Sequence, residues 1–194
     1  PDFWLPGGEV WLVPREDKTV LVKFEGTVED AWDKHHHHVE LKDCKTVKAV
    51  PYDMPIIGYG AKHISNLRLW QAEPITQFDF SQFDSGNYEK AVSDKNFAEN
   101  ISRVLYPNDN TEKGKFLRLM QQYFFCSASL QDIIKKFKQN HSELKDLPKY
   151  VTIQLNDTHP AISIPELIRL LMNESLSFNA SLEIAKKVFN YTNH

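Results

Sequence analysis

The stretch at residues 150–172, YVTIQLNDTHPAISIPELIRLLM, constrains the fold more than any other part of the sequence. It begins with a short apolar and β-branched run at residues 150–155, which predicts a strand. A polar turn follows at residues 156–160. After the turn, the apolar residues recur with the spacing of an amphipathic helix, at Leu167, Ile168, Leu170 and Leu171.

The sequence also predicts where this helix begins. Ser163 and Glu166 have the spacing of a capping box, and Pro165 falls in the first helical turn, where its missing N–H is tolerated. A strand that leads into a helix through a polar turn is the building unit of open α/β sheets, in which ligands bind beyond the carboxyl ends of the strands. We therefore expect Asp157 and His159 at a functional rim.

Composition excludes several classes of protein. The 194 residues are 41% hydrophobic and 25% charged, which is typical of a soluble globular chain. The net charge of −3, with both signs interspersed, argues against a nucleic-acid binder, and no apolar stretch is long enough for a membrane span. Cys44 and Cys126 fit no metal spacing and indicate reduced thiols of a cytoplasmic protein. Pro1 at the start and a strand-like end at residues 189–194 indicate a piece of a longer protein.

Residues 1–76 are predicted to form a β-rich portion. Residues 9–25 have the pattern of a hairpin whose connection is residues 14–18. A weaker strand pattern ends at Pro51, and the Pro and Gly residues at 53–58 predict a loop. The predicted strands are residues 9–13, 19–24, 39–50 and 64–72.

Residues 77–194 are predicted to form a helical and strand–helix portion of the same lobe, which gives an α/β fold overall. A polar connector at residues 77–86 precedes the first helix, and a cluster of turn residues at 107–110 ends it. The predicted helices are residues 87–105, 114–139 and 176–190. In the second of these, apolar residues recur at three- and four-residue steps, at Leu117, Met120, Phe124, Leu130, Ile134 and Phe137.

The residues alone leave the candidate sites open. Asp157 and His159 can both reach one polar ligand, but an Asx turn explains the same cluster. Asn108, Asp109 and Asn110 fit any turn. His35 to His38 could suggest a metal, but adjacent strand residues point to opposite faces, so we favour a solvated loop or strand edge and predict no metal site. Glycine-rich phosphate loops, common hydrolase motifs and an obvious carboxylate pair are missing.

Several long runs together carry a family resemblance. They are residues 50–55, 66–70, 98–109, 122–125, 130–134, 153–160 and 191–194, including NISRVLYPND, IQLNDTHP and YTNH. The chain resembles the α-glucan phosphorylases, which act on glycogen, starch or maltodextrin, in one register over residues 1–194. It corresponds to an interior slice of the N-terminal half of a much longer enzyme.

The resemblance implies a fold and an activity. Family members have two Rossmann-like lobes of the GT-B type, and the C-terminal lobe, which is absent here, carries pyridoxal phosphate on a lysine. They transfer the terminal α-1,4-linked glucose to inorganic phosphate with retained configuration, and the cofactor passes a proton through its phosphate. This fits the missing carboxylate pair of ordinary glycosidases. The resemblance also implies a homodimer when the enzyme is complete, and a fragment that is inactive alone.

The resemblance assigns roles to five residues. His194 matches the histidine that contacts the hydroxymethyl group of the bound glucose, with its backbone carbonyl near the developing positive charge. Asn110 matches a residue that touches a glucose hydroxyl, on a mobile loop that gates the cleft. Asp109 matches an acid that lies near the phosphate site in the inactive enzyme. Asp157 and His159 match the acid and the imidazole on the sugar side of the cleft.

The sequence also departs from the animal enzymes. Thr111 replaces an aromatic residue that closes an inhibitor site. Lys135 and Lys136 replace an arginine pair that grips a nucleotide effector, and lysine lacks the bidentate fork of arginine. We therefore expect weak AMP control at that possible effector site, and the histidine run suggests a bacterial member. Two other interpretations stay open, a stand-alone carbohydrate- or metal-binding module and a glycosyltransferase that uses a nucleotide sugar.

Overall fold

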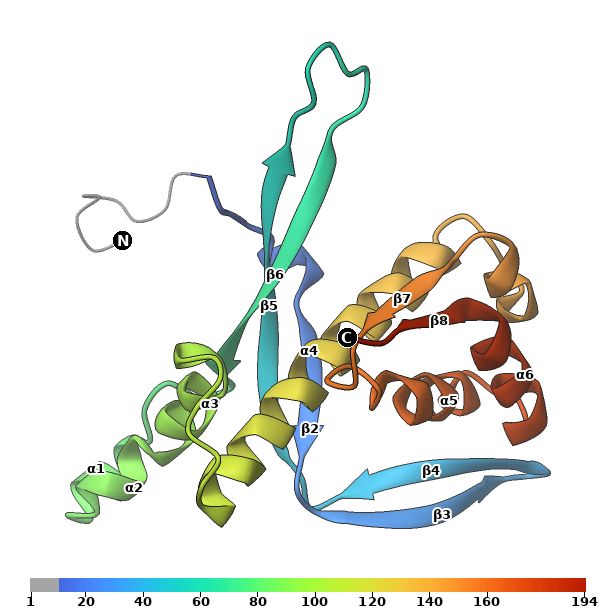
Figure 1. Ribbon diagram of the computed structural model, residues 1–194. Coiled ribbons are helices and arrows are strands. Elements are labelled where there is room, and N and C mark those ends of the chain that lie inside the picture. Colours follow the sequence, from blue (N-terminus) through green and yellow to red (C-terminus); the bar gives the residue numbers. More distant parts are fainter. Residues whose placement is uncertain (1–10) are drawn as a thin grey trace. The chain divides into compact units, whose positions relative to one another are not determined.

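A computed structural model describes residues 11–194 (Figure 1). The described chain divides into two compact units. Residues 11–21 and 47–103 belong to the first unit, and residues 22–46 and 104–194 belong to the second. The mixed α/β architecture confirms the coarse fold class, and the β-rich part ends with the last strand before the first α-helix.

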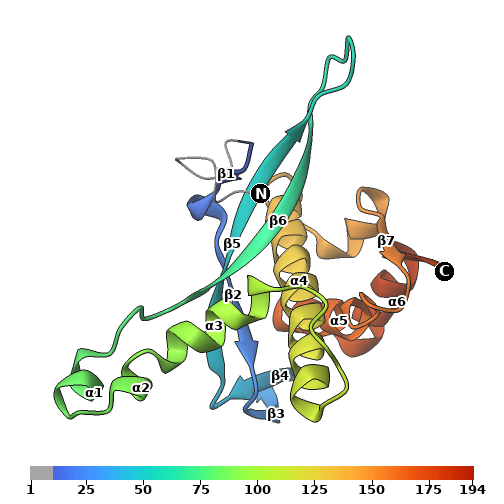
Figure 2. The same ribbon diagram turned by 60° about the vertical axis from the view of Figure 1, so that its left-hand side comes forward.

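The first unit contains a long antiparallel pair, β5 (Lys45–Ile56) and β6 (Ser65–Pro74), which is conspicuous in Figure 2. The strand predicted at residues 64–72 is thus confirmed as β6. Helix α3 (Ser93–Arg103) packs against β6, where the Ser102 hydroxyl accepts a hydrogen bond of 3.0 Å from the backbone N–H of Ala72. The remaining elements are β1 (Val13–Pro14), a 3₁₀ turn (Glu16–Lys18), α1 (Phe80–Asp84) and α2 (Tyr88–Ala91).

The hairpin expected at residues 9–25 is wrong for the described residues, and residues 9–10 lie outside them. Strand β1 pairs with β5, and β2 (Val20–Phe24) lies next to β5 as well, so the sheet order is β1-β5-β2. The connection forms a 3₁₀ turn rather than a tight reversal, and the two segments therefore do not meet. Their alternating pattern marked strands correctly but could not identify the partner strand.

The end expected at Pro51 is also wrong, and the loop expected at residues 53–58 is confirmed only at residues 57–58. Strand β5 continues through Pro51 and Pro55 to Ile56. The Pro51 carbonyl accepts a hydrogen bond of 2.8 Å from the backbone N–H of Arg15. The backbone N and O atoms of one strand residue point toward the same neighbouring strand. The nitrogen of Pro51, which carries no hydrogen, therefore also points toward Arg15, where the 3₁₀ turn separates β1 from β2. The sheet therefore loses no ladder hydrogen bond to β6 there.

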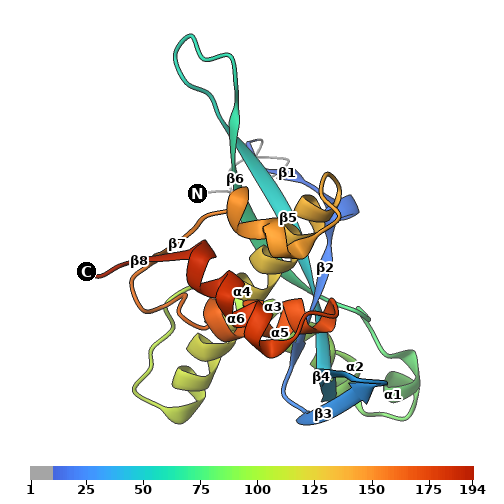
Figure 3. The ribbon, with the colours of Figure 1, turned by 90° about the vertical axis from the view of Figure 1, so that its right-hand side faces the viewer.

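The second unit is built on α4 (Glu112–Lys138), whose predicted periodicity is confirmed. Its buried residues Leu130, Ile134 and Phe137 contribute to one core with Leu167 and Leu171. The other elements, seen most clearly in Figure 3, are β3 (Thr27–Asp33), β4 (His36–Lys42), a 3₁₀ segment (Leu144–Lys149), β7 (Ile153–Asn156), α5 (Ser163–Asn173), α6 (Phe178–Val188) and β8 (Phe189–Thr192).

Strands β7 and β8 confirm the strand–helix unit predicted from the sequence. They pair in parallel, from Ile153 opposite Phe189 to Asn156 opposite Thr192. Helices α5 and α6 form the connection between them. Parallel strands require such a crossover connection, and the carboxyl ends of both strands consequently lie at the same edge. The strand expected at the chain end is therefore present.

The capping box expected at Ser163 and Glu166 is wrong. The residue before the helix is Ile162, which already has helical dihedral angles and makes no side-chain cap. The backbone N–H of Ser163 donates to the Pro160 carbonyl at 2.9 Å, so the preceding turn leads directly into the helix. Glu166 is only 4% exposed and turns toward α4 rather than back toward the helix start.

The Glu166 carboxylate forms a buried polar cluster that links α5 to α4. It accepts hydrogen bonds from the Ser127 hydroxyl at 2.6 Å and the Tyr123 hydroxyl at 3.3 Å, both on α4. The Arg169 guanidinium donates two further bonds of 2.7 Å in a bidentate pair. Burial, together with the charge of Glu166, raises the pKa of Tyr123 to about 12, so its hydroxyl stays protonated and can donate.

His35 lies in the turn before β4, and His36, His37 and His38 begin the strand and alternate between its faces. The rings of His36 and His38 lie parallel on one face with centroids 6.0 Å apart, whereas His37 pairs with Asp30 at 2.8 Å. His36 also bonds to the Met172 carbonyl at 2.7 Å. Residues 11–194 contain no group of three or more metal-type ligands arranged to hold an ion, and none of their helices has the length and apolar character of a membrane span.

The buried pair between Asp53 and Arg68 gives a prediction for the first unit. Asp53 is 6% exposed, and Arg68 on the paired strand donates two bonds of 2.7 Å to its carboxylate. The hydrogen bond from Arg68 lowers the pKa of Asp53, so the pair stabilises the fold above the unfolded-state value of about 3.9, and this contribution is lost as the pH falls through the lowered pKa.

Replacing Asp53 by Asn should therefore reduce the free energy of unfolding by about 2 kcal/mol at pH 7, with the loss shrinking toward zero in acid. Urea denaturation at pH 7 and at pH 3 measures both values. Asp17→Asn, at an exposed ion pair, is the control and should have little effect. A loss at pH 7 that stays constant down to pH 3 would contradict the assigned role of the Asp53 charge.

The Glu166 cluster gives a second prediction. Glu166→Gln removes the charge that balances the largely buried Arg169 and should lower the free energy of unfolding by about 3 kcal/mol, because an unpaired buried charge is strongly unfavourable. Urea denaturation followed by circular dichroism measures the change. Glu183→Gln, which breaks an exposed ion pair with Lys186 on α6, should leave stability unchanged. Equal effects of the two substitutions would exclude a special role for Glu166.

Candidate functional site

The carboxyl end of β7 positions the polar residues that the sequence singled out. Asn156 is the last strand residue, and Asp157 follows with a left-handed φ of 64°, a conformation that Asp tolerates better than most residues. The backbone N–H of Asp157 donates to the Thr192 carbonyl at 2.9 Å, at the end of β8. The chain therefore leaves the sheet sharply at Asp157, while that residue stays tied to the neighbouring strand.

Asp157 and His159 meet across this turn. The His159 imidazole lies 3.6 Å from the Asp157 carboxylate, and the two side chains are 45% and 31% exposed. Both groups are therefore accessible from one side, as the two-residue spacing suggested. His194, two residues beyond β8, bonds through its Nε2 to the Asn156 side chain. The structure thus brings His194 to the same sheet edge as Asp157, from a segment far away in sequence.

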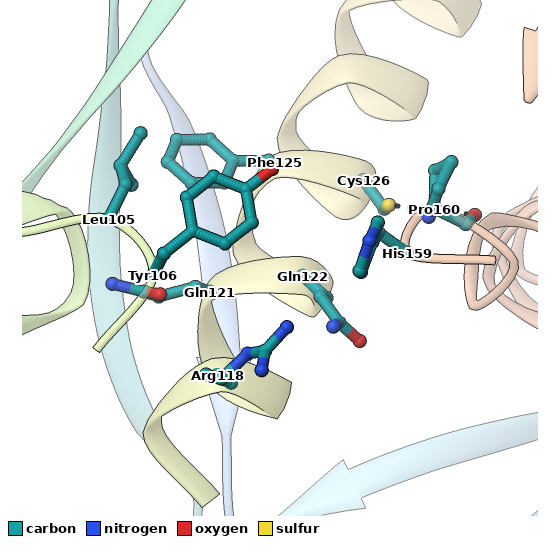
Figure 4. A pocket seen from close by; sticks show the side chains of 9 residues that line it. All are labelled: Leu105, Tyr106, Arg118, Gln121, Gln122, Phe125, Cys126, His159 and Pro160. Carbon is teal, nitrogen blue, oxygen red and sulfur yellow. Dashed lines mark hydrogen bonds between the residues drawn. The ribbon is translucent and has the colours of Figure 1, made fainter. Parts of the chain in front are cut away.

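A pocket of about 210 Å³ opens beside His159. Its walls come from the segment after α3, from α4 and from the turn after β7, and Figure 4 shows their side chains around a common space. The residues are Leu105, Tyr106, Arg118, Gln121, Gln122, Phe125, Cys126, His159 and Pro160. A cationic guanidinium, an imidazole and a side-chain amide combined with aromatic walls suit a small polar ligand with hydroxyl groups.

The pocket is arranged for binding rather than for nucleophilic chemistry. The Cys126 thiol is buried next to the Pro160 carbonyl, at 3.8 Å, and burial raises the pKa of Cys126. A thiol of raised pKa is mostly protonated and therefore a poor nucleophile at neutral pH. No aspartate or glutamate is among the residues that line this pocket, so its wall provides no carboxylate acid–base pair.

The turn at residues 107–110 lies next to this pocket. The Asp109 carboxylate forms an ion pair with Arg118, a pocket residue. The backbone N–H of Asn110 donates to the Asn108 side chain at 2.8 Å, which is the geometry of an Asx turn. Asp109 is thus linked to the pocket wall. The structure describes the contacts of these residues, and their roles toward a ligand stay predictions.

The possible effector residues lie elsewhere. Lys135 and Lys136 are exposed in the last turn of α4. They follow Arg118 by 17 and 18 residues, so the helix rise separates them from the pocket by about 25 Å. The structure therefore does not bring Lys135 and Lys136 together with the other candidates.

Tyr106 and Arg118 line the pocket but were not predicted as site residues from the sequence. The Arg118 guanidinium lies 6.0 Å from the centroid of the Tyr106 ring, and the His159 ring approaches the same tyrosine edge-on at 6.3 Å. The position of Arg118 could have been inferred from helical spacing. Arg118 stands seven residues after Thr111, so it lies on the face of α4 that meets the turn at residues 107–110. The Tyr106 ring therefore contacts both Arg118 of α4 and His159 of the turn after β7.

Comparisons with known proteins extend over the whole chain. A family model described as carbohydrate phosphorylase matches residues 1–194. The chain is 43% identical to glycogen phosphorylases of Saccharomyces cerevisiae and Chlamydia trachomatis and 45% identical to the human brain form. Each alignment covers 100% of this chain but only 22–24% of the relative, so the chain spans less than a quarter of the length of these proteins.

These matches confirm the resemblance inferred from the sequence motifs and do not favour a stand-alone binding module. The relatives come from a yeast, a bacterium and a mammal at similar identities, so the expected bacterial origin stays a prediction. A family model that matches every residue, together with identities of 43–45% along the entire chain, shows that the chain belongs to the carbohydrate phosphorylase family.

Proposed function

We propose that the chain is part of the N-terminal lobe of a longer α-glucan phosphorylase with the two-lobe GT-B fold. The complete enzyme would transfer the terminal α-1,4-linked glucose of a glucan to inorganic phosphate and release α-glucose 1-phosphate. The observation that carries this proposal is the identity of 43–45% with glycogen phosphorylases over the full chain. Residues 1–76 and 77–194 would be two portions of the same lobe.

In this proposal the edge formed by β7 and β8 faces the glucose. His194 would donate a hydrogen bond to one glucose hydroxyl and place its backbone carbonyl near the positive charge that develops at the anomeric carbon. Asp157 and His159 would line the sugar side of the cleft. Support comes from the 3.6 Å approach of Asp157 and His159, and from the bond that holds His194 beside Asn156.

Asp109 and Asn110 would act from the turn that flanks the same space. Asn110 would contact a glucose hydroxyl, and Asp109 would lie near the phosphate site when the enzyme is inactive. The link between Asp109 and Arg118 supports this placement, because Arg118 lines the pocket next to His159. A turn that is already held close to a binding pocket loses little conformational entropy when it closes over a ligand.

Pyridoxal phosphate is the cofactor expected of the complete enzyme, where its phosphate would supply the proton to the substrate phosphate. Its covalent anchor is a lysine in an enclosed site. Among residues 11–194 no lysine is buried, and none lines the pocket next to His159. The described residues therefore do not fit the role of anchor, and we assign that lysine to a part of the enzyme outside this chain.

The remaining expectations concern regulation and assembly. We propose a cytoplasmic bacterial enzyme that forms homodimers and responds weakly to AMP. The last point is supported by the exposed Lys135 and Lys136, because two separate ammonium groups cannot form the bidentate contacts that arginines make with a phosphate.

An activity assay tests the proposed function. The complete protein that contains this chain should release glucose 1-phosphate from maltodextrin and inorganic phosphate. The 194-residue chain should show no such activity, with or without added pyridoxal phosphate, because the cofactor anchor and the second wall of the cleft are missing. A complete protein without phosphorolysis, or a 194-residue chain with turnover clearly above background, would overturn the proposal.

Replacing His194 by Ala tests the proposed catalytic residue. A hydrogen bond that tightens as the glucose ring flattens toward an oxocarbenium ion stabilises mainly the transition state, so its loss lowers the rate constant more than it weakens binding. We expect a fall in kcat of about tenfold, equivalent to about 1.4 kcal/mol, with a smaller change in KM. Steady-state phosphorolysis by the complete enzyme measures both constants.

His63→Ala, at an exposed position in the connection between β5 and β6, is a matched histidine control and should leave both constants unchanged. The backbone carbonyl of His194 survives the substitution, so activity should not vanish. An unaltered kcat in His194→Ala would show that another residue contacts the reacting glucose.

A further inference from the structure

We propose that Arg118 is a positioning residue that latches the loop at residues 104–110 onto helix α4. Its effect on glucan binding rests on the function proposed above, whereas its effect on the loop does not. The loop joins α3 to α4 and carries Asp109 and Asn110. The proposal stands on the contacts that this loop makes with one face of α4.

Four residues of α4 and its cap form a stripe that meets the loop. Their spacing of three, four and three residues places them on one face of the helix. The stripe consists of Thr111, Gly114, Arg118 and Gln121. Gly114 and Arg118 contact the middle and the end of the loop and Gln121 contacts its beginning, so the helix acts as a template for the loop.

The stripe residues before and after Arg118 make close contacts. At Gly114 an added Cβ would lie 1.9 Å from the Asn108 carbonyl oxygen, so only glycine allows the loop to approach the helix this closely. The Thr111 hydroxyl caps the helix by accepting a bond of 3.1 Å from the Gly114 N–H. Gln121, which is buried, donates a bond of 2.8 Å from Nε2 to the Val104 carbonyl.

Arg118 holds the middle of the loop at two points. Its guanidinium pairs with the Asp109 carboxylate and also lies 6.0 Å from the centroid of the Tyr106 ring. The Arg118 and Asp109 side chains are 27% and 50% exposed, and an ion pair this accessible stabilises little by itself. Arg118 matters because its one side chain contacts two loop residues that lie on either side of Pro107.

Tyr106 makes the loop sensitive to this latch. Its φ of 54° is in the left-handed region, which is unfavourable for a bulky residue and persists only where surrounding contacts hold it. Tyr106 is largely exposed, and its ring contacts the Arg118 guanidinium at 6.0 Å and the His159 ring at 6.3 Å. Removing the guanidinium would leave the strained residue with fewer restraints, so the backbone would relax and the loop would move.

The proposed consequence concerns binding. In the proposed phosphorylase, the loop presents Asn110 to the glucose, and a loop already in place loses less conformational entropy when the glucan binds. Loss of the latch should therefore raise KM for the glucan, while kcat changes less because the reacting atoms keep their other contacts. Arg118 touches neither reacting atom in this proposal and acts through the loop.

Hydrogen exchange of the 194-residue chain tests the latch without an activity assay. In Arg118→Gln, the backbone amide of Asn110, which is bonded to the Asn108 side chain, should exchange roughly tenfold faster, and amides in α6 should not change. Lys115→Gln is the control, because the Lys115 ammonium pairs with Glu112 on the same helix, whereas Asp109 pairs with Arg118. Arg118→Lys should give intermediate rates, because an ammonium keeps the charge but not the planar fork.

Equal exchange rates in Arg118→Gln, Lys115→Gln and the unchanged chain would overturn the latch. Kinetics of the complete enzyme then test the consequence, and we expect KM for maltodextrin to rise about fivefold in Arg118→Gln with kcat within about twofold. Faster exchange with an unchanged KM would overturn the role in glucan binding. A complete protein without phosphorolysis would overturn the proposed function, and the exchange rates would still decide whether the latch exists.

Discussion

The Glu166 carboxylate is the contact on which the arrangement of the second unit depends most. It accepts bonds from two side chains of α4 and forms a bidentate pair with Arg169 within α5, almost completely out of water. Apolar packing holds two helices together but tolerates sliding, whereas a buried charge is stable only when its partners stand at fixed positions. Because α5 begins just after Pro160 and α4 lines the pocket, the register set by Glu166 determines where His159 meets α4.

The same residue shows why local sequence rules located the helix but not the hydrogen bonds at its start. The apolar periodicity of α4 and α5 could be predicted because each helix buries one continuous stripe, and that stripe is written in the sequence itself. The spacing of Ser163 and Glu166 satisfied a capping rule equally well. In the structure a partner 39 residues away, Ser127, takes the carboxylate instead, and no local pattern contains that information.

Strand β5 shows the same limit for prolines. Pro51 and Pro55 predicted an interruption because proline cannot donate to a sheet ladder. The strand continues because its edge without an N–H donor at Pro51 lies next to the 3₁₀ turn after Arg15 rather than next to a regular strand. Whether a proline ends a strand therefore depends on which segment lies next to its nitrogen. Periodicity in the sequence does not predict which distant segments pair.

The candidate site divides along similar lines. Asp157 and His159 could be singled out because a strand, a polar turn and a helix follow one another in the sequence, and parallel strands end at one sheet edge. That topology also brings His194 to Asn156 across 38 residues, once β8 lies beside β7. The spacing from Thr111 to Arg118 places Arg118 on the face of α4 that meets the turn, but its contact with Tyr106 could not be found in this way, since a left-handed tyrosine leaves no periodic trace. Regular elements of the chain thus specify where a site forms, and irregular contacts between them specify how its loop is held.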